Sequence, residues 1–113
     1  MRKNFEVVKG DTLAFAVEIG FDEDPTDLEE ILFTVKHNAD ADDVNLFQKS
    51  LNHGIEKIST VGNKLYYRVR ASPFDTEKLE AGMYHYDLEI HINGDVFTIL
   101  NGFLIVENEI TES

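Results

Sequence analysis

The alternation of apolar and polar residues between Met83 and Ile92 most constrains what this chain can fold into. Successive side chains of a β-strand point to opposite faces, so every second residue faces the same side. The apolar face of this segment comprises Tyr84, Tyr86, Leu88, Ile90 and Ile92. The other face comprises Met83, His85, Asp87, Glu89 and His91. The pattern predicts a strand of an antiparallel sheet with one face in a core and the other in water.

The same alternation recurs along the chain, and the dipeptides Gly62-Asn63 and Asn93-Gly94 favour tight hairpin turns. The expected strands are 5–8, 13–21, 31–36, 46–51, 55–61, 64–71, 83–92 and a last one from Asp95 onward. About seven or eight short strands with frequent turns predict an all-β, immunoglobulin-like β-sandwich of two antiparallel sheets. With 113 residues, 42% of them hydrophobic, we expect one domain over residues 1–113.

One short helical turn is expected near residues 73–80, between two of these strands. Ser72 can cap its start, Pro73 suits its first position, and Asp75 stands where a capping box needs a carboxylate. Gly82 can end it.

The segment 79–86 resembles the corner that leads into the penultimate strand of immunoglobulin-like domains. There a tyrosine hydroxyl donates a hydrogen bond to the backbone a few residues upstream. We therefore expect Tyr84 to form a structural corner. The alternative is that Tyr84 and Tyr86 are core aromatic residues without such a bond.

The charge of the chain excludes several partners. Ten basic and 22 acidic residues give a net charge of −12, which repels nucleic-acid phosphates and anionic lipid. No apolar run approaches the roughly 20 residues of a membrane-spanning helix. No apolar stretch of signal-peptide length follows the first residues, and there is no cysteine for a disulfide. We expect no nucleic-acid partner, no membrane partner and no signal peptide.

Two groups of residues are candidate metal ligands. His85, Asp87, Glu89 and His91 share one strand face, but four residues in line span about 20 Å, too far for one ion to use both histidines. Asn38 with Asp40–Asp43, and the acidic stretch Asp22–Glu30, offer the oxygen ligands that calcium prefers, without the spacing of an EF-hand. We expect solvated loops and no metal site, and leave calcium binding by these loops open.

The sequence contains no recognisable catalytic set. It has no cysteine nucleophile, no Gly-x-Ser-x-Gly elbow, no His-Glu-x-x-His motif and no glycine-rich phosphate loop. We therefore expect no catalytic residues and no cofactor.

The last expected strand is apolar on both faces. Phe97, Ile99, Phe103 and Ile105 share one parity. The even-numbered positions, which would face the opposite side, include Val96, Leu100, Leu104 and Val106. The second apolar face must be covered by the chain itself or by a partner, unless a bulge at Gly102 exchanges the faces midway. The candidate interface is the first set, which comprises Phe97, Ile99, Phe103 and Ile105.

Several segments together resemble the immunoglobulin-like domains of bacteriophage tails and baseplates. They are Val8–Phe15, Phe33–Lys36, Phe47–Leu51, Ser72–Thr76 and Ala81–Ile90. The nearest likeness is the amino-terminal domain of phage baseplate upper proteins, and it covers residues 5–106. Its motifs are turns and strand patterns.

This resemblance implies a non-catalytic structural module of a phage or prophage that docks on other tail or baseplate proteins or on a second copy of itself. It also implies assembly in the bacterial cytoplasm and a place in the virion. Because the chain ends at Ser113, we expect a small free-standing accessory protein. The alternative function is a carbohydrate-binding β-sandwich module that presents Tyr66 to a sugar.

Overall fold

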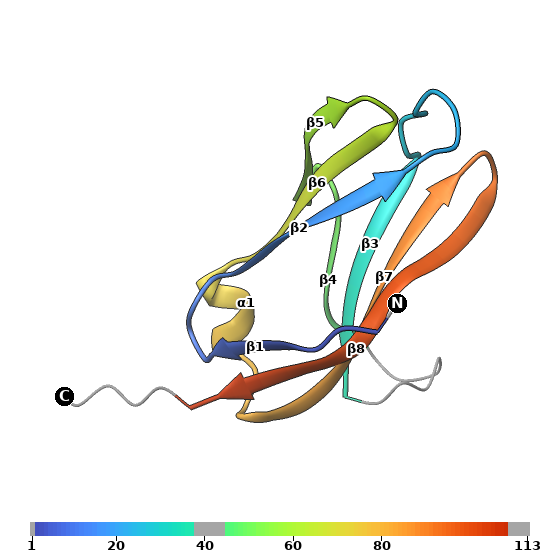
Figure 1. The fold of residues 1–113 in the computed structure, drawn as a ribbon. Helices are drawn as coiled ribbons and strands as arrows, with labels where there is room; N and C mark the ends of the chain where they lie inside the picture. Colours follow the sequence, from blue (N-terminus) through green and yellow to red (C-terminus); the bar gives the residue numbers. More distant parts are fainter. Residues whose placement is uncertain (1, 38–44, 109–113) are drawn as a thin grey trace.

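The structure, a computed structural model, describes residues 2–37 and 45–108, which form eight β-strands and one short helix (Figure 1). In chain order these are β1 (Phe5–Val8), β2 (Leu13–Gly20), β3 (Glu30–Lys36), β4 (Asn45–Leu51), β5 (Gly54–Val61), β6 (Lys64–Ala71), α1 (Pro73–Glu77), β7 (Gly82–Ile92) and β8 (Asp95–Glu107). The strands lie where the alternation predicts them, with small shifts at their ends.

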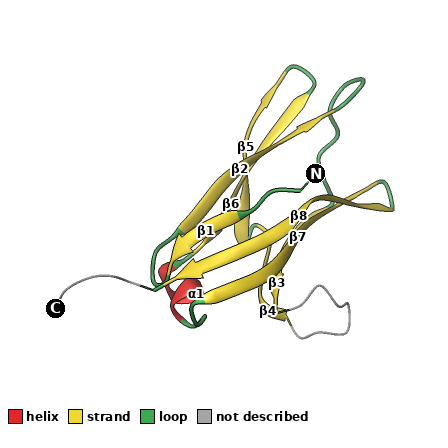
Figure 2. Cartoon of the chain, turned by 60° about the horizontal axis from the view of Figure 1, so that its bottom comes forward, coloured by secondary structure: helices red, strands yellow, loops and turns green. Residues whose placement is uncertain are grey.

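The strands form two layers. One contains β1, β8, β7, β3 and β4 in hydrogen-bonded order, and the other contains β5, β6 and β2 (Figure 2). The rings of Phe15 on β2 and Phe33 on β3 meet between the layers, with centroids 5.5 Å apart. In an immunoglobulin domain, strands B, E and D share one sheet and strands C, F and G the other. Here β2, β6 and β5 take the first set of places and β3, β7 and β8 the second. The chain is an immunoglobulin-like β-sandwich, as expected.

Two parallel pairings modify the purely antiparallel sheets that were expected. β1 runs parallel to β8, and after the turn around Gly10 the chain continues in the opposite layer as β2. β4 pairs in parallel with β5 through only two residue pairs, Ser50 with Gly54 and Leu51 with Ile55. This pairing joins the two layers into one continuous eight-stranded sheet.

The core lies between the layers and receives buried apolar residues from all eight strands. On β7, Tyr84, Tyr86, Leu88 and Ile90 are buried, which confirms the predicted apolar face. Each fully buried side chain of this kind contributes about 1.5–3 kcal/mol to the stability of the fold. The alternation of the sequence therefore determines which sides of the two layers meet.

Both predicted hairpin turns are present. Asn93 and Gly94 have positive φ angles of 52° and 81°, which tight turns between twisted strands require. Gly62, at the other turn, also has a positive φ, of 60°.

The helix α1 begins as predicted. The Asp75 amide donates a hydrogen bond to Ser72 Oγ, and the Ser72 amide donates one to Asp75 Oδ2, which is a capping box. The predicted end at Gly82 is wrong, because the helix ends at Glu77 and Gly82 is the first residue of β7. The bond from Leu79 N to Thr76 O closes the last turn before the chain enters β7.

Candidate functional site

The polar side chains of β7 lie on the side of β3, β7 and β8 that faces away from the second layer. We call this side the outer face. Strand register places its residues in cross-strand rows, because directly paired residues in a sheet point to the same side. One row brings together His85, Lys36 and Phe103, and the next brings together Asp87, Thr34 and Asn101. The outer face carries an apolar patch and, beside it, a polar groove.

A bulge in β8 decides which of its apolar side chains reach the outer face. Leu88 pairs with Leu100, whereas the next residue, Glu89, pairs with Thr98. Ile99 is therefore the extra residue of β8, and the faces exchange there. The bulge that the sequence allowed at Gly102 lies instead at Ile99, three positions earlier in the chain.

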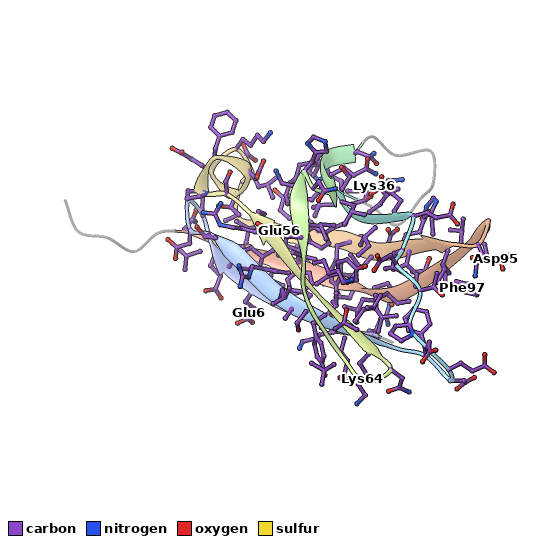
Figure 3. All side chains as sticks on the ribbon, turned by 90° about the horizontal axis from the view of Figure 1, so that it is seen from above. Glu6, Lys36, Glu56, Lys64, Asp95 and Phe97 are labelled. Atoms are coloured by element: carbon purple, nitrogen blue, oxygen red, sulfur yellow. The ribbon has the colours of Figure 1, made fainter. Side chains whose placement is uncertain are left out.

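The four residues of the candidate interface consequently do not share one face. Phe97 pairs with the buried Ile90 and points to the inner side, yet it is 50% exposed at the open end of the sandwich. It lies close to Asp95 at the tip of the β7–β8 hairpin (Figure 3). Ile99 is partly buried against the core. Phe103 and Ile105 lie on the outer face.

The apolar patch consists of Met83, Phe103 and Ile105. Met83 and Ile105 pair directly across β7 and β8, and Phe103 is the next outward residue of β8. Met83 is 60% exposed, and the other two side chains are partly exposed. The ring of His85 packs on Phe103 with centroids 4.8 Å apart, and the Arg2 guanidinium lies over the same ring at 5.8 Å. The patch is thus a continuous apolar surface with cationic and aromatic groups at its border.

The polar groove lies beside this patch and has a volume of about 510 Å³. Its lining includes Arg2, Thr34, Lys36, Asp87, Glu89 and Asn101. These residues come from β3, β7 and β8 and from the segment before β1, where Arg2 bridges to Asn101. The groove therefore depends on the sheet order, which brings together positions far apart in the chain.

Asp87 occupies the middle of the groove. Burial raises the pKa of this carboxyl above its ordinary value, the neighbouring charge of Glu89 raises it further, and Lys36 opposes both. Glu89 is held by His91, whose Nε2 lies 2.8 Å from Glu89 Oε1. The groove thus contains two carboxylates of different character, one tied to a histidine and one poorly solvated.

Tyr84 and Tyr86 both use their hydroxyl groups to bind backbone. Tyr84 Oη donates a 2.6 Å hydrogen bond to the carbonyl oxygen of Glu80, which is the bond of a tyrosine corner. Tyr86 Oη donates a 2.5 Å hydrogen bond to the carbonyl oxygen of Lys3. Burial raises the pKa of Tyr86 to about 12. These two bonds tie the first part of β7 to the turn that precedes it and to the segment before β1.

The candidate metal ligands do not converge. Within residues 2–37 and 45–108, no group of three His, Cys, Asp or Glu side chains is placed to hold a metal ion. In the acidic stretch Asp22–Glu30, Asp27 binds Lys57 at 2.6 Å and Glu29 accepts a hydrogen bond from Gly94 N at 3.0 Å. Asn38 and Asp40–Asp43 lie outside the described residues.

Tyr66 lies on the other layer, on the outward side of β6. It pairs with Glu18 of β2, and its hydroxyl donates a 3.2 Å hydrogen bond to Glu18 Oε1. Glu18 also binds Lys64 at 2.8 Å, and the Lys64 ammonium lowers the pKa of Glu18. The tyrosine is therefore part of a small polar network, far in the strand order from the groove.

Arg2, Thr34, Lys36 and Asn101 were not singled out from the sequence. Each is a polar residue at an outward position, with no motif around it. Only the register of β3, β7 and β8 could have joined them to Asp87.

The chain matches no protein-family profile and no curated protein. Among solved structures it is similar to a family 123 glycoside hydrolase from Clostridium perfringens that hydrolyses glycolipid glycans, with a TM-score of 0.56 and 9% identity. The similarity covers 98% of this chain but only 24% of that enzyme, so the chain spans about a quarter of the enzyme's length.

Two further similar structures have lower TM-scores. One comes from a study of cell-adhesive β subunits of voltage-gated sodium channels, with a TM-score of 0.41, 8% identity and coverage of 97% of this chain and 93% of that one. The other is a ZIG-8–RIG-5 immunoglobulin-domain heterodimer, with a TM-score of 0.39, 14% identity and coverage of 94% and 82%. In the described part of the chain, no helix has the length and apolar character needed to cross a membrane.

Proposed function

We propose that this protein is a non-catalytic interaction module of a phage or prophage tail or baseplate, and that it acts through protein–protein contacts made by the apolar patch. The observation that carries the proposal is the continuous exposure of Met83, Phe103 and Ile105 on the outer face. The phage assignment rests on the resemblance of the sequence segments between Val8 and Ile90. The proposed places of action are the bacterial cytoplasm during assembly and the virion afterwards.

The composition of the patch and its border is that of a protein interface. Single exposed apolar residues are ordinary on protein surfaces, whereas adjacent ones favour a contact with another molecule. Interfaces are enriched in Phe, Met and Arg, and their apolar centre is surrounded by polar groups. Met83, Phe103 and Ile105 supply such a centre, and Arg2 and His85 supply part of the border.

The proposed partners are other tail or baseplate proteins, with a second copy of the chain as the alternative occupant. A two-fold dimer would place the patch of one copy on the same patch of the other, so one substitution would change both sides of the interface. Binding to a tail protein would leave the isolated chain monomeric. The oligomeric state of the purified chain therefore distinguishes the two occupants.

The test is co-expression with candidate tail and baseplate proteins of phages and prophages, followed by size-exclusion chromatography with light scattering. We expect the wild-type chain to elute in a complex or as a dimer, and Met83→Glu and Phe103→Glu to abolish this association. A suitable control is Val61→Glu, because Val61 is also 60% exposed but lies at the end of β5, in the other layer. The control variant should associate as the wild type does.

Two results would contradict the proposal. One is a wild-type chain that remains monomeric at all concentrations and joins none of the tail proteins. The other is an association that Val61→Glu weakens as much as Met83→Glu does, because the patch would then not be the contact surface.

A further inference from the structure

The polar groove is built from a cross-strand row of hydrogen-bonding side chains. Asp87 pairs with Asn101 on one side and with Thr34 on the other, and the backbone of Arg2 forms a parallel β-bridge with Asn101 at the end of the row. All four residues line the groove. The row thus presents a carboxylate, an amide, a hydroxyl and a guanidinium side by side to one open space.

The carboxylate of Asp87 lines the groove and is partly buried there. It makes no hydrogen bond within residues 2–37 and 45–108, although the side chain is partly buried. Partial burial removes water from a carboxylate, and the loss is compensated only when donors replace that water. The groove leaves room for such donors directly beside Asp87.

The neighbours of Asp87 are already held in position. Thr34 Oγ1 accepts a 2.8 Å hydrogen bond from Gln48 Nε2, so its hydroxyl proton is free to be donated elsewhere. Glu89 is fixed by His91 at 2.8 Å, and the Arg2 guanidinium rests over the Phe103 ring. Side chains that are ordered before binding lose less conformational entropy when a ligand arrives.

The charges of the groove select the class of ligand. Among the described lining residues, Arg2 and Lys36 contribute two positive charges and Asp87 and Glu89 two negative charges, so these four charges balance. A cationic ligand would be repelled by Arg2 and Lys36, and an anionic ligand would be repelled by Asp87 and Glu89. A neutral molecule with several hydroxyl groups meets neither penalty, because a hydroxyl donates to a carboxylate and accepts from a guanidinium or an ammonium.

We propose that the polar groove binds a neutral saccharide, with Asp87 accepting hydrogen bonds from its hydroxyl groups and Arg2 and Asn101 donating to them. A volume of about 510 Å³ lies within the usual range of small-ligand sites, which is roughly 300–1,000 Å³. This is an activity beyond the proposed protein–protein contact. It uses a neighbouring part of the outer face, which shares Arg2 with the border of the patch.

The test uses an array of neutral, sialylated and sulfated glycans, followed by calorimetry and ligand-observed NMR with the neutral glycans that bind. We expect Asp87→Asn to weaken their binding about tenfold or more, because it removes a charged hydrogen-bond acceptor. Asn101→Ala should weaken it as well. The matched control is Glu56→Gln, which neutralises an exposed carboxylate on β5, in the other layer, and should leave binding within about twofold of the wild type.

Separate readouts keep this inference distinct from the interface at the patch. Met83→Glu should retain saccharide binding even where it abolishes the protein complex. A thermal melt of Asp87→Asn without ligand should show a folded protein, because burial opposes the charge that this substitution removes. A saccharide that binds the native protein should raise the melting temperature of the wild type more than that of Asp87→Asn at the same saccharide concentration.

Several outcomes would overturn the inference. One is that no neutral glycan binds, either on the array or at millimolar glycan concentration in ligand-observed NMR. Another is binding restricted to sialylated or sulfated glycans. A third is binding of a neutral glycan that Asp87→Asn leaves unchanged and Tyr66→Ala abolishes, which would move the site to the other layer.

Discussion

The carbonyl oxygen of Lys3 lies directly over Gly102, so close that a β-carbon at Gly102 would come within 2.2 Å of it. The carbonyl cannot move away freely, because it accepts the hydrogen bond from Tyr86 Oη. Glycine at this position therefore allows the segment before β1 to lie against β8. That segment carries Arg2 to the outer face.

Replacement of this glycine tests the packing. We expect Gly102→Ala to lower the free energy of unfolding by about 2 kcal/mol, since backbone must shift to admit the methyl group. Urea denaturation followed by circular dichroism measures the change. The control is Gly20→Ala on β2, where an added β-carbon meets nothing within 4 Å. Equal stability of the two variants would contradict the close approach of Lys3 to Gly102.

The tyrosine corner gives a second prediction. Tyr84→Phe removes the hydrogen bond to Glu80 O and leaves the buried ring in place. We expect a loss of about 1 kcal/mol in the free energy of unfolding, the typical value for one intramolecular hydrogen bond. Tyr66→Phe serves as the control, because the Tyr66 hydroxyl bonds to an exposed glutamate, and its loss should be close to zero. A Tyr84→Phe protein as stable as the wild type would show that the corner bond contributes nothing.

The ion pair at the helix predicts a pH dependence of stability. Burial alone would raise the pKa of Asp75, but the Lys49 ammonium at 2.7 Å and the hydrogen bonds from Ser72 hold it below its ordinary value of 3.8. A lowered pKa in the folded state stabilises the protein above pH 3.8, and this stability is lost as the pH falls through the folded-state pKa. We expect Asp75→Asn to cost about 1 kcal/mol at neutral pH, because it removes the charged acceptor of the Lys49 ammonium.

The cost of Asp75→Asn should shrink as the pH falls, because the wild-type carboxyl becomes neutral as well. Thermal melts between neutral pH and pH 3 measure this, since that window brackets the ordinary pKa of 3.8. Glu77→Gln is the control, because it neutralises an exposed carboxylate on the same helix. A cost for Asp75→Asn that stays constant with pH would contradict the role of the ion pair.

The sequence was sufficient to predict the inner faces of the strands, the hairpin turns and the start of the helix. The alternation from Tyr84 to Ile90 depends only on the period of a strand and on burial, so it predicts the inner face of β7. The turn at Asn93-Gly94 and the capping box at Ser72 are local, and they too could be predicted from neighbouring residues. The parallel pairing of β1 with β8 joins distant segments and has no local signal.

The candidate site could not be predicted from the sequence in the same way, because it depends on how distant strands pair. Alternation along β8 assigns Phe97 and Phe103 to one face, but Ile99 is the extra residue of the bulge, and the faces exchange there. A bulge depends on how two strands pair, and the alternation of residues within one strand carries no information about that pairing. The groove depends on pairing in the same way, because Thr34 and Asn101 meet Asp87 only through the register of three strands.

The partly buried carboxyl of Asp87 gives the last prediction, and its sign is opposite to that of Asp75. Burial raises its pKa above 3.8, so the folded state binds this proton more tightly than the unfolded state does. The resulting stability is fully present below pH 3.8 and is lost as the pH rises through the folded-state pKa. The ionised carboxylate therefore destabilises the native protein at neutral pH.

We expect Asp87→Asn to raise the free energy of unfolding at neutral pH by about 0.5 kcal/mol, a small gain because solvent still reaches the side chain. The gain should disappear below pH 3.8, where the wild-type carboxyl is neutral too. Urea denaturation of both proteins at several pH values measures the difference, with Asp95→Asn at the exposed hairpin tip as the control. If Asp87→Asn instead destabilises the protein at neutral pH, then the carboxylate is held by donors in the folded chain, and the groove has no vacant acceptor for a saccharide hydroxyl.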